Sequence, residues 1–199
     1  MGRARHILMA KALLLDAFAA ELRAQGVTVL SGRSESDEAA PPYWLWVEVL
    51  RGVAASSELS DMLDELGPEG DEVRLILPEP NAGRAERAAS WGGEQGRFLL
   101  FDAVTRLILS EAERRPLAIA LEDLHWAPPG SLRLLEHLVY EMRGRPLLIA
   151  AAVRTEPRAM EHPLSRSLGL VGGLDHVEAI SLGPLTISII GGWRLRTAT

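Results

Sequence analysis

Two adjacent carboxylates stand at the end of a short apolar segment in the middle of the chain. Glu122 and Asp123 directly follow residues 117–121, five apolar residues preceded by Pro116. A short apolar run bounded by a proline and by charges predicts a strand buried on both faces of a parallel sheet. Acids at the carboxyl end of such a strand lie where α/β sheets bind ligands, and there they hold Mg²⁺ and orient a water beside a nucleotide. The alternative is a strand followed by a solvated acidic turn.

The rest of the chain alternates between helical and strand patterns. Helices are expected at residues 7–25, from residue 43, around 62–66, at 98–114 and at 132–142; strands are expected at 27–30, 117–121, 147–153 and 177–182. The apolar stripe of the first helix contains Leu14, Leu15 and Phe18. Loops are expected at residues 34–42 and through Pro157 and Pro163. This alternation predicts a parallel α/β sheet with right-handed crossovers.

The composition excludes several classes of function. The net charge of -6 argues against a nucleic-acid surface, because neutralising phosphates needs clustered Lys and Arg. The absence of cysteine excludes disulfides, thiolate metal ligands and cysteine nucleophiles, and it fits a cytoplasmic protein. Lys11 and Asp16 interrupt the N-terminal apolar stretch, unlike a signal peptide, and no apolar run reaches the ~20 residues that span a bilayer. We therefore expect neither membrane nor direct nucleic-acid binding.

Four segments, taken together, resemble one known family. Residues 121–127, Leu-Glu-Asp-Leu-His-Trp-Ala, resemble the Walker B segment of AAA-type and STAND-type ATPases, which occur in LuxR-type regulators and in modules coupled to adenylate cyclases or kinases. The other three are similar to the segment after the family's second strand, to the helix before Walker B and to the strand carrying the sensor-1 arginine. They are Gly32-Arg33 with residues 40–46, residues 95–104 and residues 151–156.

The resemblance implies a fold and a set of site residues. It implies an α/β, three-layer P-loop NTPase-like parallel sheet, as a partial AAA/STAND domain over residues 1–186 with a non-family tail at 187–199. The implied cofactors are ATP and Mg²⁺. Glu122 would hold Mg²⁺ and Asp123 would polarise the attacking water, although these two roles could be exchanged. Arg154 would sense the γ-phosphate, or else it is an ordinary surface arginine.

The phosphate-binding loop is where the sequence departs from the family. A Walker A loop is Gly-x-x-x-x-Gly-Lys-Ser/Thr. Lys11 falls on the lysine of that motif, but Ala10 and Ala12 replace the preceding glycine and the following hydroxyl residue. Lys11 is therefore either the remnant of a cofactor-binding lysine or a helical lysine whose stem lies on the apolar face. Losing three charged-group hydrogen bonds removes about 5–9 kcal/mol, whereas a micromolar ligand binds with about 8. We expect this chain alone neither to bind ATP tightly nor to hydrolyse it.

The sheet is also expected to be incomplete. The resemblance places the strand before Walker A between the Walker B strand and the sensor strand, and the sequence leaves no room for it. Those strands would lack a shared neighbour unless the strand ending near Val153 moves over or a partner fills the gap. Both ends look clipped, as in a gene fragment, without the C-terminal helical lid. The alternative function is therefore a non-catalytic fragment that binds a protein partner, or itself, through exposed sheet edges and a Trp44/Trp46 surface.

Overall fold

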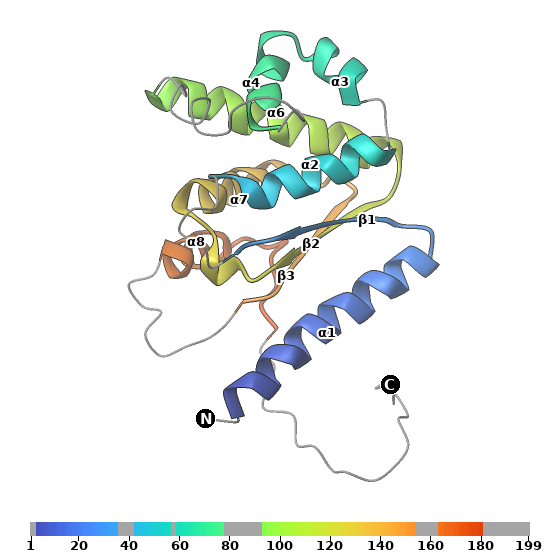
Figure 1. Ribbon diagram of the computed structural model, residues 1–199, viewed down its shortest axis with the longest axis vertical. Coiled ribbons are helices and arrows are strands. Elements are labelled where there is room, and N and C mark those ends of the chain that lie inside the picture. Colours follow the sequence, from blue (N-terminus) through green and yellow to red (C-terminus); the bar gives the residue numbers. More distant parts are fainter. Residues whose placement is uncertain (1–2, 36–41, 57–58, 78–92, 154–162, 181–199) are drawn as a thin grey trace.

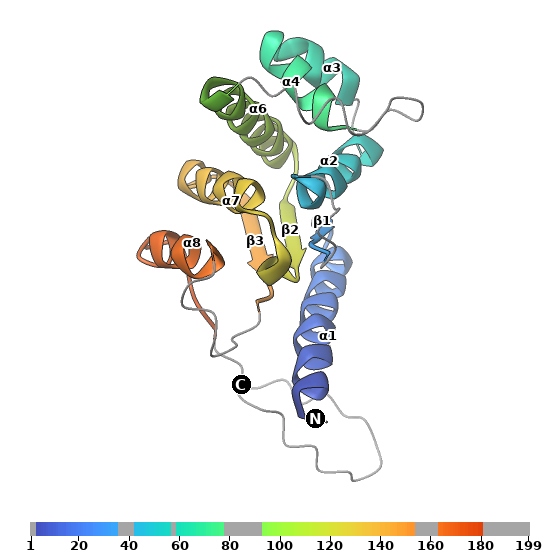
Figure 2. The same ribbon diagram turned by 60° about the vertical axis from the view of Figure 1, so that its left-hand side comes forward.

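A computed structural model describes residues 3–35, 42–56, 59–77, 93–153 and 163–180 (Figure 1). In chain order its elements are α1 (Arg3–Ala24), β1 (Thr28–Arg33), α2 (Trp44–Ser56), α3 (Leu59–Glu65), α4 (Pro68–Ile76), α6 (Gly93–Arg114), β2 (Leu117–Glu122), the 3₁₀ turn η1 (Leu124–Trp126), α7 (Pro129–Glu141), β3 (Leu147–Ala151) and α8 (Pro163–Val171). Helix α1 covers one face of the sheet, while α2 and α7 cover the other, with α6 beyond them (Figures 1 and 2). The predicted three-layer α/β arrangement is confirmed.

The three described strands form one parallel sheet in the order β1-β2-β3. The central strand β2 pairs with β1 on one side, from Thr28 opposite Leu117 to Arg33 opposite Glu122. On its other side β2 pairs directly with β3. The strand that the family resemblance places between β2 and β3 is therefore absent from the described sheet, as the sequence predicted. Of the two alternatives, the strand leading to Val153 lies next to the Walker B-like strand, so both edges of β2 have a hydrogen-bonded neighbour.

The register assigns alternate residues of each strand to opposite faces of the sheet. Towards α2 and α7 point large side chains, among them Leu30, Ile119 and Leu121, which are almost completely buried. Helix α2 packs so closely here that a Cβ at Gly52 would lie 2.8 Å from Leu30 Cδ2. Towards α1 point Ala118, Ala120 and Leu148, so this face is built mainly from small residues. The bulk of the core thus lies between the sheet and α2, α6 and α7.

Helix α1 contacts the sheet through a narrower stripe than the sequence predicts. Leu15 and Ala19 are buried, whereas Leu14 and Phe18 are exposed, although the pattern placed Leu14, Leu15 and Phe18 on one apolar face. Apolar periodicity gives the width of a helix stripe, but the partner surface decides which part of it is covered. Here the partner is a sheet face built mainly from small residues, and the row of Leu15 and Ala19 is buried beside it.

Among the described α-helices, α4 and α8 were not predicted, and both begin at a proline. The expected helix around residues 62–66 is α3, which ends at Glu65, and Pro68 shortly after it begins α4. Pro163 begins α8, where a loop was expected. Proline suits the first turn of a helix because its missing N–H would have no intrahelical partner there. The strand expected at residues 177–182 is absent over 177–180, and its last two residues lie outside the described part of the chain.

Candidate functional site

Glu122 and Asp123 lie at the carboxyl end of the central strand, as predicted. Glu122 is the last residue of β2, and Asp123 takes a left-handed conformation with φ 54° and ψ 35°. Aspartate tolerates this conformation better than most residues, and here it ends the strand and begins η1. The chain then enters α7 with a proline at its start. The backbone therefore leaves the strand direction directly after Glu122.

Arg33 is a site residue that the sequence analysis did not single out. It ends β1 opposite Glu122, and its Nε donates to Glu122 Oε2 at 3.0 Å, with Nη2 donating to the same oxygen. Its backbone N–H donates to Oε2 of Glu48 on α2 at 2.7 Å. The hydrogen bond and charge of Glu122 raise the pKa of Arg33 above its ordinary value, with smaller contributions from Asp123 and Asp16. The segment Gly32-Arg33 was part of the family resemblance, which was the available signal.

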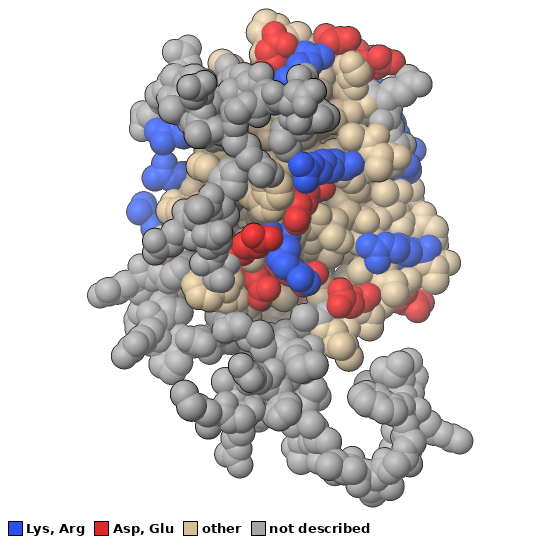
Figure 3. Space-filling view, viewed as in Figure 1, with Lys and Arg blue, Asp and Glu red and all other residues tan. Residues whose placement is uncertain are grey.

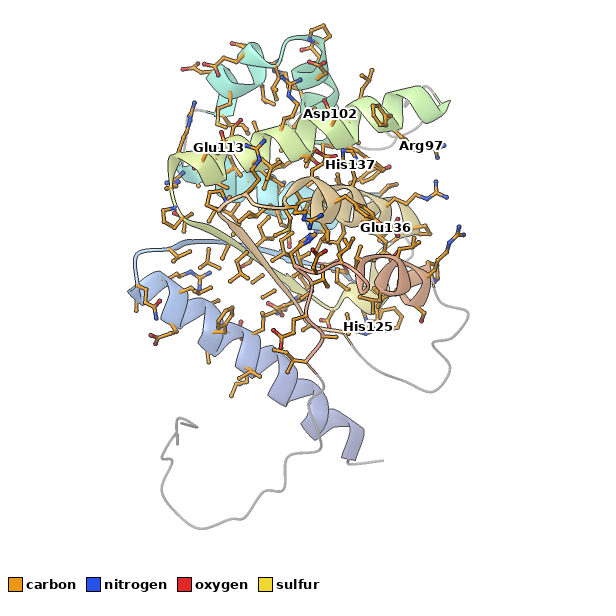
Figure 4. All side chains as sticks on the ribbon, turned by 180° about the vertical axis from the view of Figure 1, so that it is seen from behind. Arg97, Asp102, Glu113, His125, Glu136 and His137 are labelled. Atoms are coloured by element: carbon orange, nitrogen blue, oxygen red, sulfur yellow. The ribbon has the colours of Figure 1, made fainter. Side chains whose placement is uncertain are left out.

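The turn after Asp123 holds His125 against the protein and leaves Trp126 at the surface. The His125 side chain is largely buried, its Nδ1 lies 3.9 Å from Asp123 Oδ1, and its ring centroid is 4.9 Å from that of Trp126. Trp126 is exposed, so of these two residues it is His125 that packs the turn. Figure 4 shows His125 well away from His137, which lies beside α6. The two histidines therefore do not converge on one site.

Contacts between the two helix starts hold the end of the sheet in place. Tyr43, just before α2, has φ 66° and is buried, and a Cβ at Gly130 would lie 3.0 Å from its hydroxyl oxygen. Trp46 Nε1 donates to the backbone oxygen of Ser131 on α7 at 3.0 Å. Trp46 is completely buried, so the expectation of a Trp44/Trp46 partner surface is wrong for Trp46. Its indole instead joins α2 to the helix that follows Asp123.

Of the two predicted phosphate-binding residues, the structure describes the backbone of Lys11 and does not describe Arg154. Lys11 lies inside α1, well after the first residue of that helix, rather than at a helix start that follows a loop. A lysine there has no exposed backbone N–H groups beside it, because those belong to the first turn. Arg154 lies outside the described residues. The described residues closest to it in sequence follow β3, where the Ala152 N–H donates to the backbone oxygen of Leu121 at 2.9 Å.

The donor set fits a hard divalent cation better than it fits a nucleotide. Mg²⁺ uses one or two carboxylates and completes its shell with water and phosphate oxygens, so Glu122 and Asp123 would suffice. Among described residues no group of three acidic or histidine side chains forms a metal cluster. For phosphates the match is poorer, since residues 1–199 contain no Walker A motif and their single lysine is in a helix interior. The two carboxylates therefore have the chemistry that a cation requires, whereas the described residues around Lys11 are helical rather than a phosphate-binding loop.

Two features of the described residues bear on the expectations about membranes and nucleic acids. On the face in Figure 3, acidic and basic side chains are interspersed and form no continuous basic patch among the residues described. Of the helices described, none combines the length and apolarity needed to cross a bilayer. Neither observation identifies a partner.

Comparison with known proteins places the chain in a family. Its sequence matches the family described as AAA ATPase domain over residues 9–150, a span that contains Lys11, Glu122 and Asp123. Searches of curated proteins and of solved structures each returned no match. The family match covers more than half of the 199 residues and coincides with a parallel sheet that ends in the paired carboxylates. The chain belongs to the AAA ATPase domain family.

Proposed function

We infer that the chain is the nucleotide-binding module of a STAND-like signalling or transcription-regulatory ATPase, with the cation end of its site kept and the phosphate loop lost. One observation carries the inference: adjacent carboxylates end the central strand of a parallel sheet in an AAA-type domain. The regulatory role and the extension of the domain to residue 186 rest on the resemblance of the sequence, and the cytoplasmic location rests on the absence of cysteine.

In this proposal each chemical role belongs to a named side chain. Glu122 binds Mg²⁺ directly or through water, and the cation would neutralise charge on phosphate oxygens. Asp123, which is partly exposed, orients and polarises a water. Lys11 and Arg154 supply positive charge toward phosphates, with Arg154 sensing the γ-phosphate. Without a backbone cradle, ATP binds weakly and turnover by this chain alone is negligible.

Calorimetric titration with ATP and Mg²⁺ tests the proposal. Wild type should show weak binding heat that disappears in the double variant Glu122→Gln/Asp123→Asn. The matched control is Glu113→Gln/Asp175→Asn, which removes the same two charges from exposed pairs with Arg145 and Arg143 near the amino end of β3. Exposed pairs contribute little to stability, so the control should bind like wild type. Equal binding by the site variant and the control would contradict the proposal.

A second candidate function is protein interaction without catalysis. Strand β3 has β2 as its one neighbour among described residues, and Leu148 on it is exposed, as are Leu13, Leu14 and Phe18 on α1. An unpaired strand edge flanked by apolar side chains favours association with another chain. Absence of heat at millimolar ATP together with a cooperative thermal unfolding transition would favour this function. Light scattering after size-exclusion chromatography would then separate self-association from binding to another protein.

A further inference from the structure

The Glu122 carboxylate already has a cation in the structure, the guanidinium of Arg33. Two N–H groups of Arg33, on Nε and Nη2, donate to the single oxygen Oε2. The Glu122 side chain is 14% exposed and that of Arg33 is 57% exposed. A carboxylate so far removed from water needs a paired cation, whereas the exposed guanidinium can be hydrated wherever it moves. Glu122 is thus the fixed member of the pair and Arg33 the exchangeable one.

Acidic groups from several neighbouring elements act on Arg33. Glu122 comes from β2 and Asp123 from the turn after it, and Asp16 acts on the guanidinium from α1. Glu48 on α2 accepts the backbone N–H of Arg33 and holds its main chain in place when the side chain moves. Moving the guanidinium away would leave the Glu122 carboxylate without its paired cation, near the charges of Asp123 and Asp16. Such a cluster attracts another cation, and a divalent ion supplies more charge in less space.

We propose that Arg33 and a divalent cation compete for the Glu122 carboxylate, so that the cation binds only when the arginine side chain swings out to solvent. The inference rests on the proposed function, because it takes Glu122 as a cation ligand. The structure then represents the arginine-bound state of the site. Arg33 is a positioning residue that sets how much of the protein is competent to bind the cation.

The competition has a measurable size. When a competent state is partly populated, the apparent dissociation constant equals the intrinsic constant divided by the competent fraction. If Arg33 occupies Glu122 in about nine molecules of ten, removing the guanidinium tightens cation binding about tenfold. A purely structural ion pair would instead change the melting temperature and leave cation affinity unaltered.

The test is a Mn²⁺ titration of the full chain without nucleotide, followed by the electron paramagnetic resonance signal of free Mn²⁺. Arg33→Gln should bind Mn²⁺ about tenfold more tightly than wild type, and Arg33→Lys should gain less because its charge remains. Arg33→Gln/Glu122→Gln should lose the gain. The matched control Arg143→Gln removes an arginine from an exposed pair with Asp175 and should bind like wild type.

The outcomes separate the competition from the proposed function. If Arg33→Gln keeps wild-type affinity while Glu122→Gln weakens binding, Glu122 is a cation ligand and the competition is wrong. If wild type and Arg33→Gln both lack saturable Mn²⁺ binding, the cation role of Glu122 fails and the competition with it. A second measurement needs no variant: Mg²⁺ should shift the Nε–Hε resonance of Arg33 in ¹⁵N-labelled wild type and speed its exchange with water. A resonance unchanged at saturating Mg²⁺ would overturn the proposal even if Arg33→Gln failed to fold.

Discussion

The two faces of the sheet differ in how completely they are packed. Facing α2 and α7, the sheet presents large aliphatic side chains that are almost fully buried, most of them on β2, and Trp46 and Tyr43 join the two helix starts. Facing α1, the sheet presents alanines, one exposed leucine and the Arg33–Glu122 pair. The first face supplies most of the folding energy, and the second holds the charged groups that bind ligands in the proposed function.

This difference separates stability from binding chemistry within one small sheet. The Glu122 carboxylate, on the face towards α1, lies at the end of a rigid strand. It nevertheless lies beside a surface that water and ions reach. The rigid backing comes from the opposite face, where packing is dense. Variants on the densely packed face should therefore change stability most, and variants on the α1 face should change binding most.

The largest effect on stability is expected from shortening a side chain on the densely packed face of the sheet. Ile119→Ala removes a fully buried side chain and should lower the free energy of unfolding by about 2–5 kcal/mol, through lost burial and the cavity left behind. The matched variant on the other face, Leu148→Ala, removes a side chain that is 43% exposed and should cost less than about 1 kcal/mol. Urea denaturation measures both. Equal costs would show that the two faces are packed alike.

A smaller effect is expected within α1, where adjacent leucines differ in burial. Leu15→Ala should destabilise by about 2–3 kcal/mol, near the low end for a buried leucine because this face is thinly covered. Leu14→Ala, one residue earlier and 53% exposed, should cost under about 0.5 kcal/mol. Thermal melts followed by circular dichroism compare the two directly. If Leu14→Ala proved the more damaging change, the stripe predicted from sequence, and not the observed one, would be the buried face.

The third effect concerns close packing between β1 and α2. A Cβ at Gly32 would lie 2.6 Å from the backbone oxygen of Leu45, so Gly32→Ala must displace the start of α2 and should cost about 1–2 kcal/mol. Gly169→Ala in α8 is the control, because nothing lies within 4 Å of that position and alanine favours a helix by up to about 1 kcal/mol. Chemical denaturation should show opposite signs for the two variants. A neutral Gly32→Ala would mean that α2 yields without cost.

The sequence predicts the fold class and the carboxylate position because both depend on local pattern. Five apolar residues ending in Glu122 and Asp123 suffice to identify a buried strand and its carboxyl end. The pairing of Arg33 with Glu122 could not be predicted, because it depends on the register between strands that lie 89 residues apart. The direct contact of β2 with β3 and the buried row of α1 likewise depend on tertiary packing. Pro68 and Pro163 were misread because a proline ends one helix and begins another equally well.

The location of the cation tests the proposed site most directly. Crystals of the full chain grown with Mn²⁺ and ATP, measured at a wavelength where manganese scatters anomalously, would place the ion without reference to activity. We expect an anomalous peak about 2–2.5 Å from a carboxylate oxygen of Glu122 or Asp123, with Arg33 turned away from Glu122. Bound manganese elsewhere in the molecule, with the Arg33–Glu122 pair intact, would contradict the assignment of these carboxylates.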